Sequence, residues 1–389
     1  MKPPQSTLRY RMPAEWEPHA STWMAWPHYR GDWPGKFDPI PWVYAEIIRH
    51  LGRHERIDLI VNSAASQTTA RKVLEKADAP CNNVHFHQWP TNRVWTRDSG
   101  CTFVIADARV GTAAIGGPVE RSSRAVEGHG LSRASSANKK GGALAPEVNL
   151  AAVTWRFNAW AKYSNYRHDA KIGARMAKAV GANKILPLYG KSHLILEGGS
   201  LDVNGRGTLL TTEECLLSQV QQRNPAMNRA AYEKLFSDCL GISNVIWLGS
   251  GIAGDDTHGH IDDIARFVSP DTVVTAVESD PGDPNYEPLR DNVRRLREAA
   301  DQDGKSLAII ELPMPGAVVF ERRRLPASYA NFYIANGLVL VPVFNDPNDR
   351  VALDILADLF PDREIVGIYS GDLIWGFGAM HCMTQQQPL

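Results

Sequence analysis

Cysteine is scarce in this sequence of 389 residues, and its positions exclude two classes of cysteine-rich protein. The five cysteines are Cys81, Cys101, Cys215, Cys239 and Cys382. Their number is odd, they are widely separated, and no two of them form a CxxC pair. Such a pattern predicts neither a disulfide framework nor a zinc ribbon. We expect four of them to be small buried side chains, whereas Cys382, near the end of the sequence, calls for a separate explanation.

Long hydrophobic runs and an excess of one charge are also missing. No stretch approaches the roughly 18 apolar residues of a membrane-spanning helix, and the first residues, MKPPQSTLRYRMPAEW, lack the apolar segment of a secretory signal. The sequence has 42 Lys and Arg against 43 Asp and Glu, a formal net charge of -1. This balance predicts neither a nucleic acid nor a membrane as partner. With 43% apolar residues, the composition is that of a globular protein, which we expect in the cytoplasm.

One segment has little apolar character and interrupts the globular pattern. Residues 111–147 read GTAAIGGPVERSSRAVEGHGLSRASSANKKGGALAPE, which is rich in Gly, Ser and Ala. Because no apolar period runs through it, we predict a long, flexible surface loop inserted between two strands. The chain, residues 1–389, is then expected to form a single domain that carries this insertion.

Outside this segment, a unit of one amphipathic helix and one short apolar strand recurs. Helices are predicted at 41–54, 66–77, 168–180, 228–240, 286–303 and 349–359. Short strands are predicted at 57–61, 84–89, 184–188, 245–249, 307–312 and 364–369. The later helices start roughly 60 residues apart, a spacing that predicts a few similar α/β modules arranged around an axis.

Hairpins follow the later strands of this pattern, and they help to separate two fold classes. Their turns are predicted at Asn204-Gly205, Pro270-Asp271 and Asn336-Gly337. A doubly wound parallel sheet would also contain alternating helices and strands. However, hairpins imply antiparallel neighbours, and no glycine-rich phosphate loop follows an early strand. These observations favour an α/β propeller built from small sheets.

Polar residues of catalytic type recur in or beside the segment that follows the short strands. They are Asp98, Glu197, His260, Asp262, Asn331 and Cys382. If the modules surround an axis, equivalent positions meet in one central pocket. Asp98 could instead be a turn residue, and Asn331 could satisfy buried backbone groups. For Glu197 we favour a functional role over a structural one, because it ends the apolar run LILE, where burial of an unpaired carboxylate is costly.

A zinc site is a competing interpretation of residues 257–264, THGHIDDI. On a strand, His258 and His260 would lie on one face, as in the His-x-His-x-Asp-His pattern of metallo-β-lactamase-type hydrolases. Asp263 stands where that pattern has its last histidine, and the only histidine after His260 is His381. We therefore predict no metal.

Cys382 is either an inert buried thiol or a nucleophile. The GFG just upstream permits a close approach of the backbone, and the polar run TQQQ follows. A thiolate needs a cation nearby, yet the candidate set has an excess of carboxylates. Such a set suits a cationic guanidine substrate: carboxylates hold the guanidinium, the bound cation stabilises the thiolate, and a histidine transfers protons.

Ordered blocks over nearly the whole chain carry a family resemblance. They are MPAEWEPHASTWMAWP (12–27), VWTRDSG (94–100), WRFNAW (155–160), LEGGSLDVNGRGTLLTTEECLL (196–217), RNP (223–225), GDDTHGHIDDIARFV (254–268), PASYANFYIANG (326–337) and HCMTQQQP (381–388). These blocks resemble the agmatine deiminase and bacterial-type peptidyl-arginine deiminase family of the guanidino-group-modifying (pentein) superfamily. The resemblance implies a five-bladed α/β propeller without metal or organic cofactor. It also implies conversion of agmatine to N-carbamoylputrescine and ammonia through a covalent thiouronium intermediate.

The same resemblance assigns catalytic roles. It implies that Cys382 is the nucleophile, that His260 is the general acid and base, and that Glu197 is the carboxylate partner of His260. It also implies that Asp98 and Asp262 grip the guanidinium nitrogens. The expected partner is thus a small cationic guanidine.

The resemblance extends to residues farther from the reacting atoms, and it has gaps. By it, Trp95 lines the channel, Asn331 lies near the reacting centre, and Asp256 lies near the far end of the substrate. The sequence departs from the family pattern near the pocket rim, where Phe377 replaces a glycine and Cys101 a proline. Free or peptidyl arginine, amidino transfer to an amine, and a catalytically inactive binding protein therefore stay as alternatives, and so does a homodimer.

Overall fold

The computed structural model describes residues 9–106 and 150–389. The loop predicted at 111–147 lies outside the described residues. Within them, the strands form several small sheets instead of one continuous sheet, which confirms an α/β fold and excludes the doubly wound alternative. None of the helices in these two ranges is both long and apolar enough to cross a bilayer.

Five of the sheets have three or four strands. In order of their hydrogen-bonded neighbours they are β1 (Tyr10–Arg11), β5 (Thr102–Ala106), β6 (Leu150–Val153), β7 (Asn183–Ile185); β10 (Asp202–Val203), β11 (Thr208–Thr212), β12 (Asn244–Leu248); β13 (Ala265–Ser269), β14 (Thr272–Val277), β15 (Ala308–Pro313); β18 (Tyr333–Ala335), β19 (Leu338–Val343), β20 (Glu364–Tyr369); and β21 (Gln385–Pro388), β2 (His19–Ala25), β3 (Arg56–Val61), β4 (Val84–Gln88). Two hairpins stand apart, β8 (Leu188–Tyr189) with β9 (Ser192–His193), and β16 (Val319–Phe320) with β17 (Arg323–Arg324).

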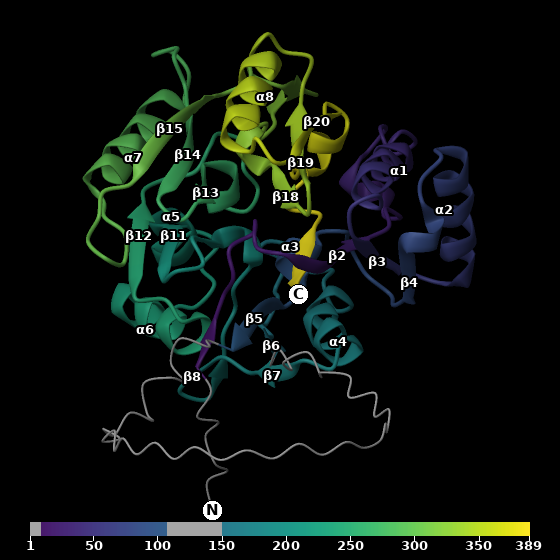
Figure 1. Cartoon of the computed structure of the whole chain (residues 1–389), viewed down its shortest axis with the longest axis horizontal. Coiled ribbons are helices and arrows are strands. Elements are labelled where there is room, and N and C mark those ends of the chain that lie inside the picture. Colours follow the sequence, from purple (N-terminus) through teal and green to yellow (C-terminus); the bar gives the residue numbers. More distant parts are fainter. Residues whose placement is uncertain (1–8, 107–149) are drawn as a thin grey trace, which may run out of the picture.

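The longer helices lie outside these sheets. The longer ones are α1 (Ile40–Leu51), α2 (Ala64–Lys76), α4 (Ile172–Ala179), α6 (Arg229–Leu240), α7 (Tyr286–Glu298) and α8 (Asn348–Leu359). The shorter ones are η1 (Arg30–Asp32), η2 (Cys81–Asn83), α3 (Thr96–Ser99), η4 (Asp169–Lys171), η5 (Gly198–Ser200), α5 (Glu213–Leu217), η6 (Ile261–Asp263), η7 (Tyr329–Asn331) and η8 (Leu373–Gly376). Figure 1 shows the longer helices at the periphery and the short helix α3 near the centre.

One pairing pattern recurs along the chain. In the unit β10–β11–α6–β12, the first two strands form an antiparallel hairpin, and the third strand pairs parallel with the second. The units β13–β14–α7–β15 and β18–β19–α8–β20 repeat this order. A parallel pair needs a crossover connection, and the helix supplies it in each unit. The three hairpins predicted from turn residues are confirmed.

The sheet around β2 joins the two ends of the chain. β21 pairs antiparallel with β2, while β3 and β4 extend the sheet in parallel. The hydrogen bonds of β21 therefore hold the segment that carries Cys382, although fewer than ten residues follow this cysteine.

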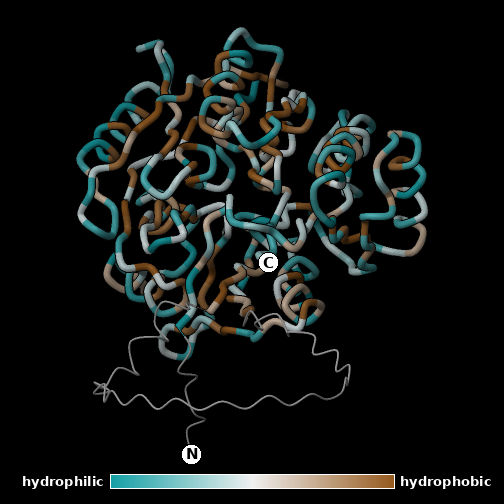
Figure 2. Tube along the Cα trace, viewed as in Figure 1, coloured by the Kyte–Doolittle hydropathy of each residue, from teal (hydrophilic) through white to brown (hydrophobic). Residues whose placement is uncertain are grey.

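The longer helices pack apolar faces against strands, and several of them contact two neighbouring sheets. In α7, Leu289, Val293 and Leu296 are buried, at the spacing that places them on one face, and the helix contacts β12 and β14. Figure 2 shows the strands mostly brown and the outer helical turns mostly teal, as this packing requires. Burial of an apolar side chain of this size contributes about 1.5–3 kcal/mol.

Two element boundaries differ from the prediction. The helix predicted at 286–303 ends at Glu298, because the backbone of Ala299 turns to an extended conformation and Ala300 pairs with Ser306. The strand predicted at 184–188 is divided between β7 and β8, which belong to different sheets. The apolar pattern of the sequence does not indicate where the chain leaves one sheet and begins to pair in another.

Candidate active site

The candidate catalytic residues lie on short helices or turns, each of which precedes a β-strand. Asp98 lies in α3 before β5, Glu197 immediately before η5 and β10, His260 and Asp262 at η6 before β13, Asn331 in η7 before β18, and Cys382 in the turn before β21. The short helices contact one another, α3 with η5, η5 with η6, and η6 with η7. The structure thus brings these six residues together, and all six are buried.

The thiol of Cys382 lies among carboxylates. Its Sγ accepts a hydrogen bond from Asn331 Nδ2 at 3.2 Å and lies 3.7 Å from Asp262 Oδ2. The same Asn331 nitrogen donates to Asp263 Oδ1 at 3.0 Å. Burial raises the pKa of the Cys382 thiol well above its ordinary value, and the carboxylates of Asp262, Asp263 and Asp98 raise it further. The free site therefore holds a neutral thiol at neutral pH.

His260 is fully buried between carboxylates that face both ring nitrogens. Its Nδ1 lies 3.9 Å from Asp98 Oδ1 and 4.0 Å from Asp262 Oδ1, and its Nε2 lies 3.8 Å from Glu197 Oε2. Burial opposes protonation of the ring, but the carboxylates outweigh burial and raise the pKa of His260 well above its usual value. The imidazole is therefore set to carry a proton, as a general acid requires.

The carboxylates keep oxygens free for a ligand. Asp98 Oδ2 accepts a hydrogen bond from Trp160 Nε1 at 2.8 Å, and Glu197 Oε1 accepts one from Arg223 Nε at 3.2 Å. Among the described residues, Glu197 Oε2 and Asp262 Oδ1 have no hydrogen-bond partner. Buried polar atoms are usually satisfied, so these two oxygens indicate where the donor groups of a ligand bind.

The sequence analysis missed a layer of residues behind the site. The ring of His381 is hydrogen-bonded to Asp262 Oδ2 at 2.7 Å through Nδ1 and to Glu15 Oε2 at 2.8 Å through Nε2. Arg97 and Arg266 donate to the Glu15 carboxylate at 3.0 and 2.8 Å. Burial opposes ionisation of Asp262, but His381 outweighs it and lowers the pKa of Asp262. The MPAEWEP block and the residue next to Cys382 were the available signals.

The site opens into a cavity of about 530 Å³. Cys382, Asp98 and the predicted channel residue Trp95 line it, and Phe377 lies at its wall beneath the Arg323 guanidinium, 3.9 Å from the ring centre. The small size of Gly378 allows the approach of Trp95 to Cys382, because a Cβ there would lie 2.6 Å from the indole. The cavity is thus broad enough for a small substrate and leads to the thiol.

Asp256, predicted to lie near the far end of a substrate, lines the same cavity. Its carboxylate is already ion-paired with Lys162 and Arg323, and it accepts a hydrogen bond from Tyr163 Oη at 2.5 Å. A cationic group at this end of a substrate would compete with Lys162 and Arg323.

The residues of the THGHIDDI segment separate in the structure. His258, which has a left-handed backbone with φ of 67°, contacts Ser218 and Glu214 instead of the central carboxylates. His260 has a different neighbour that the sequence analysis had treated as a buried hydrophobe, Cys215. Within the described residues, Glu197, Cys215 and His260 are one group whose side-chain atoms could hold a metal ion.

Gly199 lies where a side chain would disturb the whole group. A Cβ there would be 2.5 Å from His260 Nδ1, 2.9 Å from Asp262 Oδ2 and 3.0 Å from Asp98 Oδ1. We expect Gly199→Ala to lower the turnover rate at least about 100-fold, because displacements of about 1 Å in a reacting group have effects of this size. Steady-state kinetics measure the loss, with the surface variant Gly282→Ala as control. Full activity in Gly199→Ala would show that these three side chains need not hold their positions.

Comparison with known proteins shows that the chain is similar to deiminases. The family model described as Porphyromonas-type peptidyl-arginine deiminase matches residues 11–388. Agmatine deiminase of Pseudomonas fluorescens is 33% identical, with 97% of this chain and 95% of the relative covered. Agmatine deiminase of Pseudomonas aeruginosa is 32% identical, with 100% and 99% covered.

A solved structure agrees with these sequences. The agmatine deiminase of Enterococcus faecalis superposes with a TM-score of 0.79 at 28% identity, covering 97% of this chain and 96% of that one. The similarity therefore extends over the sheets and the turns that carry the buried polar group.

Proposed function

The chain belongs to the Porphyromonas-type peptidyl-arginine deiminase family, and from that premise we propose that it is a cysteine-dependent amidinohydrolase. The substrate that the relatives support is agmatine, which the reaction converts to N-carbamoylputrescine and ammonia. One observation carries the proposal. A buried thiol faces carboxylates, and two carboxylate oxygens, Glu197 Oε2 and Asp262 Oδ1, lack hydrogen-bond partners among the described residues.

The first half of the reaction forms a bond to sulfur. The guanidinium donates hydrogen bonds to Asp98, Asp262 and Glu197, which fixes its planar carbon near Cys382. Its positive charge offsets the carboxylates that raise the pKa of the thiol, so the thiol loses its proton to solvent and becomes the thiolate when substrate is bound. The thiolate attacks the guanidinium carbon, and His260 protonates the departing nitrogen. Ammonia leaves, and an S-alkylthiouronium remains on Cys382.

The second half returns the sulfur. His260, having given up its proton, takes one from a water molecule, which attacks the thiouronium carbon. The carbon–sulfur bond breaks, and the hydroxyl proton of the adduct passes to the departing thiolate as the ureido carbonyl forms, which restores the thiol. Asn331, which donates to Sγ, and His381, which holds Asp262, act as positioning residues.

For the architecture, we propose that the five larger sheets are the blades of a pseudo-fivefold α/β propeller in a single domain. Support comes from the repeated hairpin–helix–strand order, from a polar residue on the turn before one strand of each larger sheet, and from the pairing of β21 with β2.

Product assays test the function directly. We expect ureido product and ammonia in equal amounts from agmatine. Free arginine and an arginyl peptide belong in the same assay. Lys162 and Arg323, which are ion-paired with Asp256 in the cavity, are positive charges that the carboxylate of such a substrate can contact. If none of the three is turned over by the native chain, the proposal is wrong. If only the arginine compounds react, the chemistry stands and agmatine is the wrong substrate.

The raised pKa of Cys382 predicts a pH effect. Burial and the negative charges of Asp262, Asp263 and Asp98 disfavour the thiolate, so removing one charge lowers the thiol pKa. Iodoacetamide alkylates the thiolate of Cys382, so the rate of alkylation rises with pH. In the absence of substrate, we expect this rise to occur at a lower pH in Asp262→Asn than in the native chain. Peptide mass spectrometry of the Cys382 peptide across a pH series measures this. An unchanged or upward shift of the profile would contradict the charge argument.

Phe377 is placed to influence the choice of substrate. It lines the cavity, stacks beneath Arg323, and has a left-handed backbone with φ of 68°, which glycine adopts without strain. We expect Phe377→Gly to widen the cavity and to raise kcat/KM for the arginyl peptide relative to agmatine at least about threefold. Competition assays with both substrates measure the ratio. An unchanged ratio would exclude Phe377 as a determinant of selectivity.

A further inference from the structure

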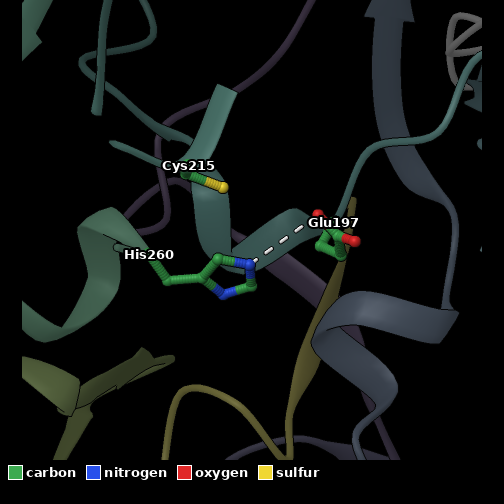
Figure 3. A group of neighbouring side chains, drawn as sticks. All are labelled: Glu197, Cys215 and His260. Carbon is green, nitrogen blue, oxygen red and sulfur yellow. Dashed lines mark ion pairs between the residues drawn. The ribbon is translucent and has the colours of Figure 1, made fainter. Parts of the chain in front are cut away.

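Glu197, Cys215 and His260 form a buried group of three different metal-ligand types. Glu197 precedes η5, Cys215 lies in α5, and His260 precedes η6, so three separate segments supply the group. One ligand atom from each residue lies within 4.8 Å of the others. Figure 3 shows the Cys215 thiol directed toward the region of the imidazole, with Glu197 facing the ring from another side.

The ligand atoms of this group have few competing partners. Glu197 and His260 are fully buried, and Cys215 is almost so. Among the described residues, Glu197 Oε2 and both ring nitrogens of His260 make no hydrogen bond. Leaving a buried polar atom unsatisfied is unfavourable, so a ligand that contacts these atoms is favoured.

The surroundings of the group attract a cation. Asp98 Oδ1 and Asp262 Oδ1 lie 3.9 and 4.0 Å from His260 Nδ1, and both belong to the buried set of carboxylates. Arg223, at 3.2 Å from Glu197 Oε1, is the opposing charge, but it contacts the other oxygen of that carboxylate. A small divalent ion can therefore contact Glu197 Oε2 without displacing Arg223.

The ligand types select the ion. A thiol, an imidazole and a carboxylate suit Zn²⁺, whereas Mg²⁺ and Ca²⁺ prefer oxygen ligands only. Zinc bonds of about 2.0–2.3 Å place tetrahedral ligand atoms about 3.3–3.8 Å apart, so separations of up to 4.8 Å must shorten by up to about 1.5 Å. Small side-chain rotations suffice for this change.

We propose that Glu197, Cys215 and His260 bind Zn²⁺, that Cys215 and His260 release their protons to solvent as the metal bonds form, and that the bound ion inhibits the enzyme. The ion uses the imidazole and the carboxylate that the proposed reaction needs for proton transfer. It also places two positive charges where a guanidinium must bind. Zinc and the guanidine substrate therefore compete, and the ion is an inhibitor of the thiol chemistry, not a participant in it.

Metal binding is tested first without any turnover. Co²⁺ serves as the probe, because a cobalt–thiolate bond gives an intense near-ultraviolet absorption. In Cys382→Ser, which lacks the proposed nucleophile, we expect one equivalent of Co²⁺ to produce this band. Adding Cys215→Ser should abolish the band, while adding Cys239→Ser, which removes another buried thiol in α6, should leave it. A band that survives loss of Cys215, or no band at all, would overturn the proposal.

Inhibition is tested on the native chain with the substrate that it turns over, and this arm rests on the proposed function. Each variant is compared with its own rate in the presence of a chelator. We expect Zn²⁺ to inhibit the native chain, and the inhibiting concentration to rise at least about tenfold in Cys215→Ser but not in Cys239→Ser.

The outcomes separate the two proposals. Inhibition that is unchanged in Cys215→Ser would place the ion elsewhere and overturn the metal site. Activity that requires zinc and disappears with chelator would overturn both the inhibitory role and the thiol mechanism. If Cys215→Ser does not fold, displacement of Co²⁺ from Cys382→Ser by agmatine still decides, since a site remote from the carboxylates would not respond to a guanidine.

Discussion

Replacing one sulfur atom, in Cys382→Ser, is expected to lower turnover at least about 10⁴-fold, the scale seen when an enzyme loses its nucleophile. A serine hydroxyl at this position is a far weaker nucleophile, and the surrounding carboxylates of Asp262, Asp263 and Asp98 oppose its ionisation as they oppose that of the thiol. Binding of the guanidinium should persist, because its carboxylate partners remain. Ureido-product and ammonia assays measure the rate, and calorimetry with substrate measures the binding.

A matched control separates this effect from the general loss of a buried thiol. Cys239 is also buried, but it lies in α6 on the side remote from the central turns, and Cys239→Ser should keep nearly full activity. Undiminished activity in Cys382→Ser would exclude the thiouronium mechanism. Equal losses of turnover in both variants would indicate that removing a buried thiol impairs folding, and not that Cys382 acts in the reaction.

The second large effect is expected for His260→Ala, which should lower turnover by about 10²- to 10⁴-fold. The imidazole faces Asp98, Glu197 and Asp262. Within the described residues, the nearby His381 cannot readily replace it, since both of its ring nitrogens are hydrogen-bonded to carboxylates. Without the base that activates water, the covalent adduct should persist on Cys382. Intact-protein mass spectrometry after mixing with substrate detects it.

The neighbouring histidine provides the control for this variant. His258 contacts Ser218 and Glu214, away from the central carboxylates, so His258→Ala should neither accumulate adduct nor lose more than a few-fold in rate. If His260→Ala turns over at the native rate, another group transfers the protons. If it is slow but carries no adduct, His260 acts only in the first half of the reaction.

Local sequence signals located most helices and hairpins. In α7 the apolar residues Leu289, Val293 and Leu296 recur at helical spacing, and in the β18–β19 turn Gly337 adopts a left-handed backbone with φ of 65°. Both features depend only on residues close in sequence. The predicted end of α7 was wrong, because Ala300, just beyond the helix, pairs with Ser306, and apolar spacing does not indicate such a pairing.

The candidate site was found unevenly for a similar reason. Cys382, His260 and Glu197 are conspicuous, because each interrupts an apolar or glycine-rich context with a reactive side chain. Glu15 and Cys215 are not conspicuous in the sequence, and neither was selected. Their importance comes from contacts with residues that lie far away in the chain, Glu15 with His381 and Cys215 with His260.

The sequence by itself determined the repeated helix–strand–hairpin order and the scattered cysteines, since these depend on composition and local periodicity, and its ordered blocks carried the resemblance to guanidine-modifying enzymes. Only the tertiary structure decided which groups share a solvent-free volume. The raised pKa of Cys382, the ion pair of Asp256 with Lys162 and the proximity of Cys215 to Glu197 and His260 all follow from distances between atoms that are far apart in the sequence. Burial and Coulomb interactions act through space, so they exist only after the five sheets have placed these turns side by side.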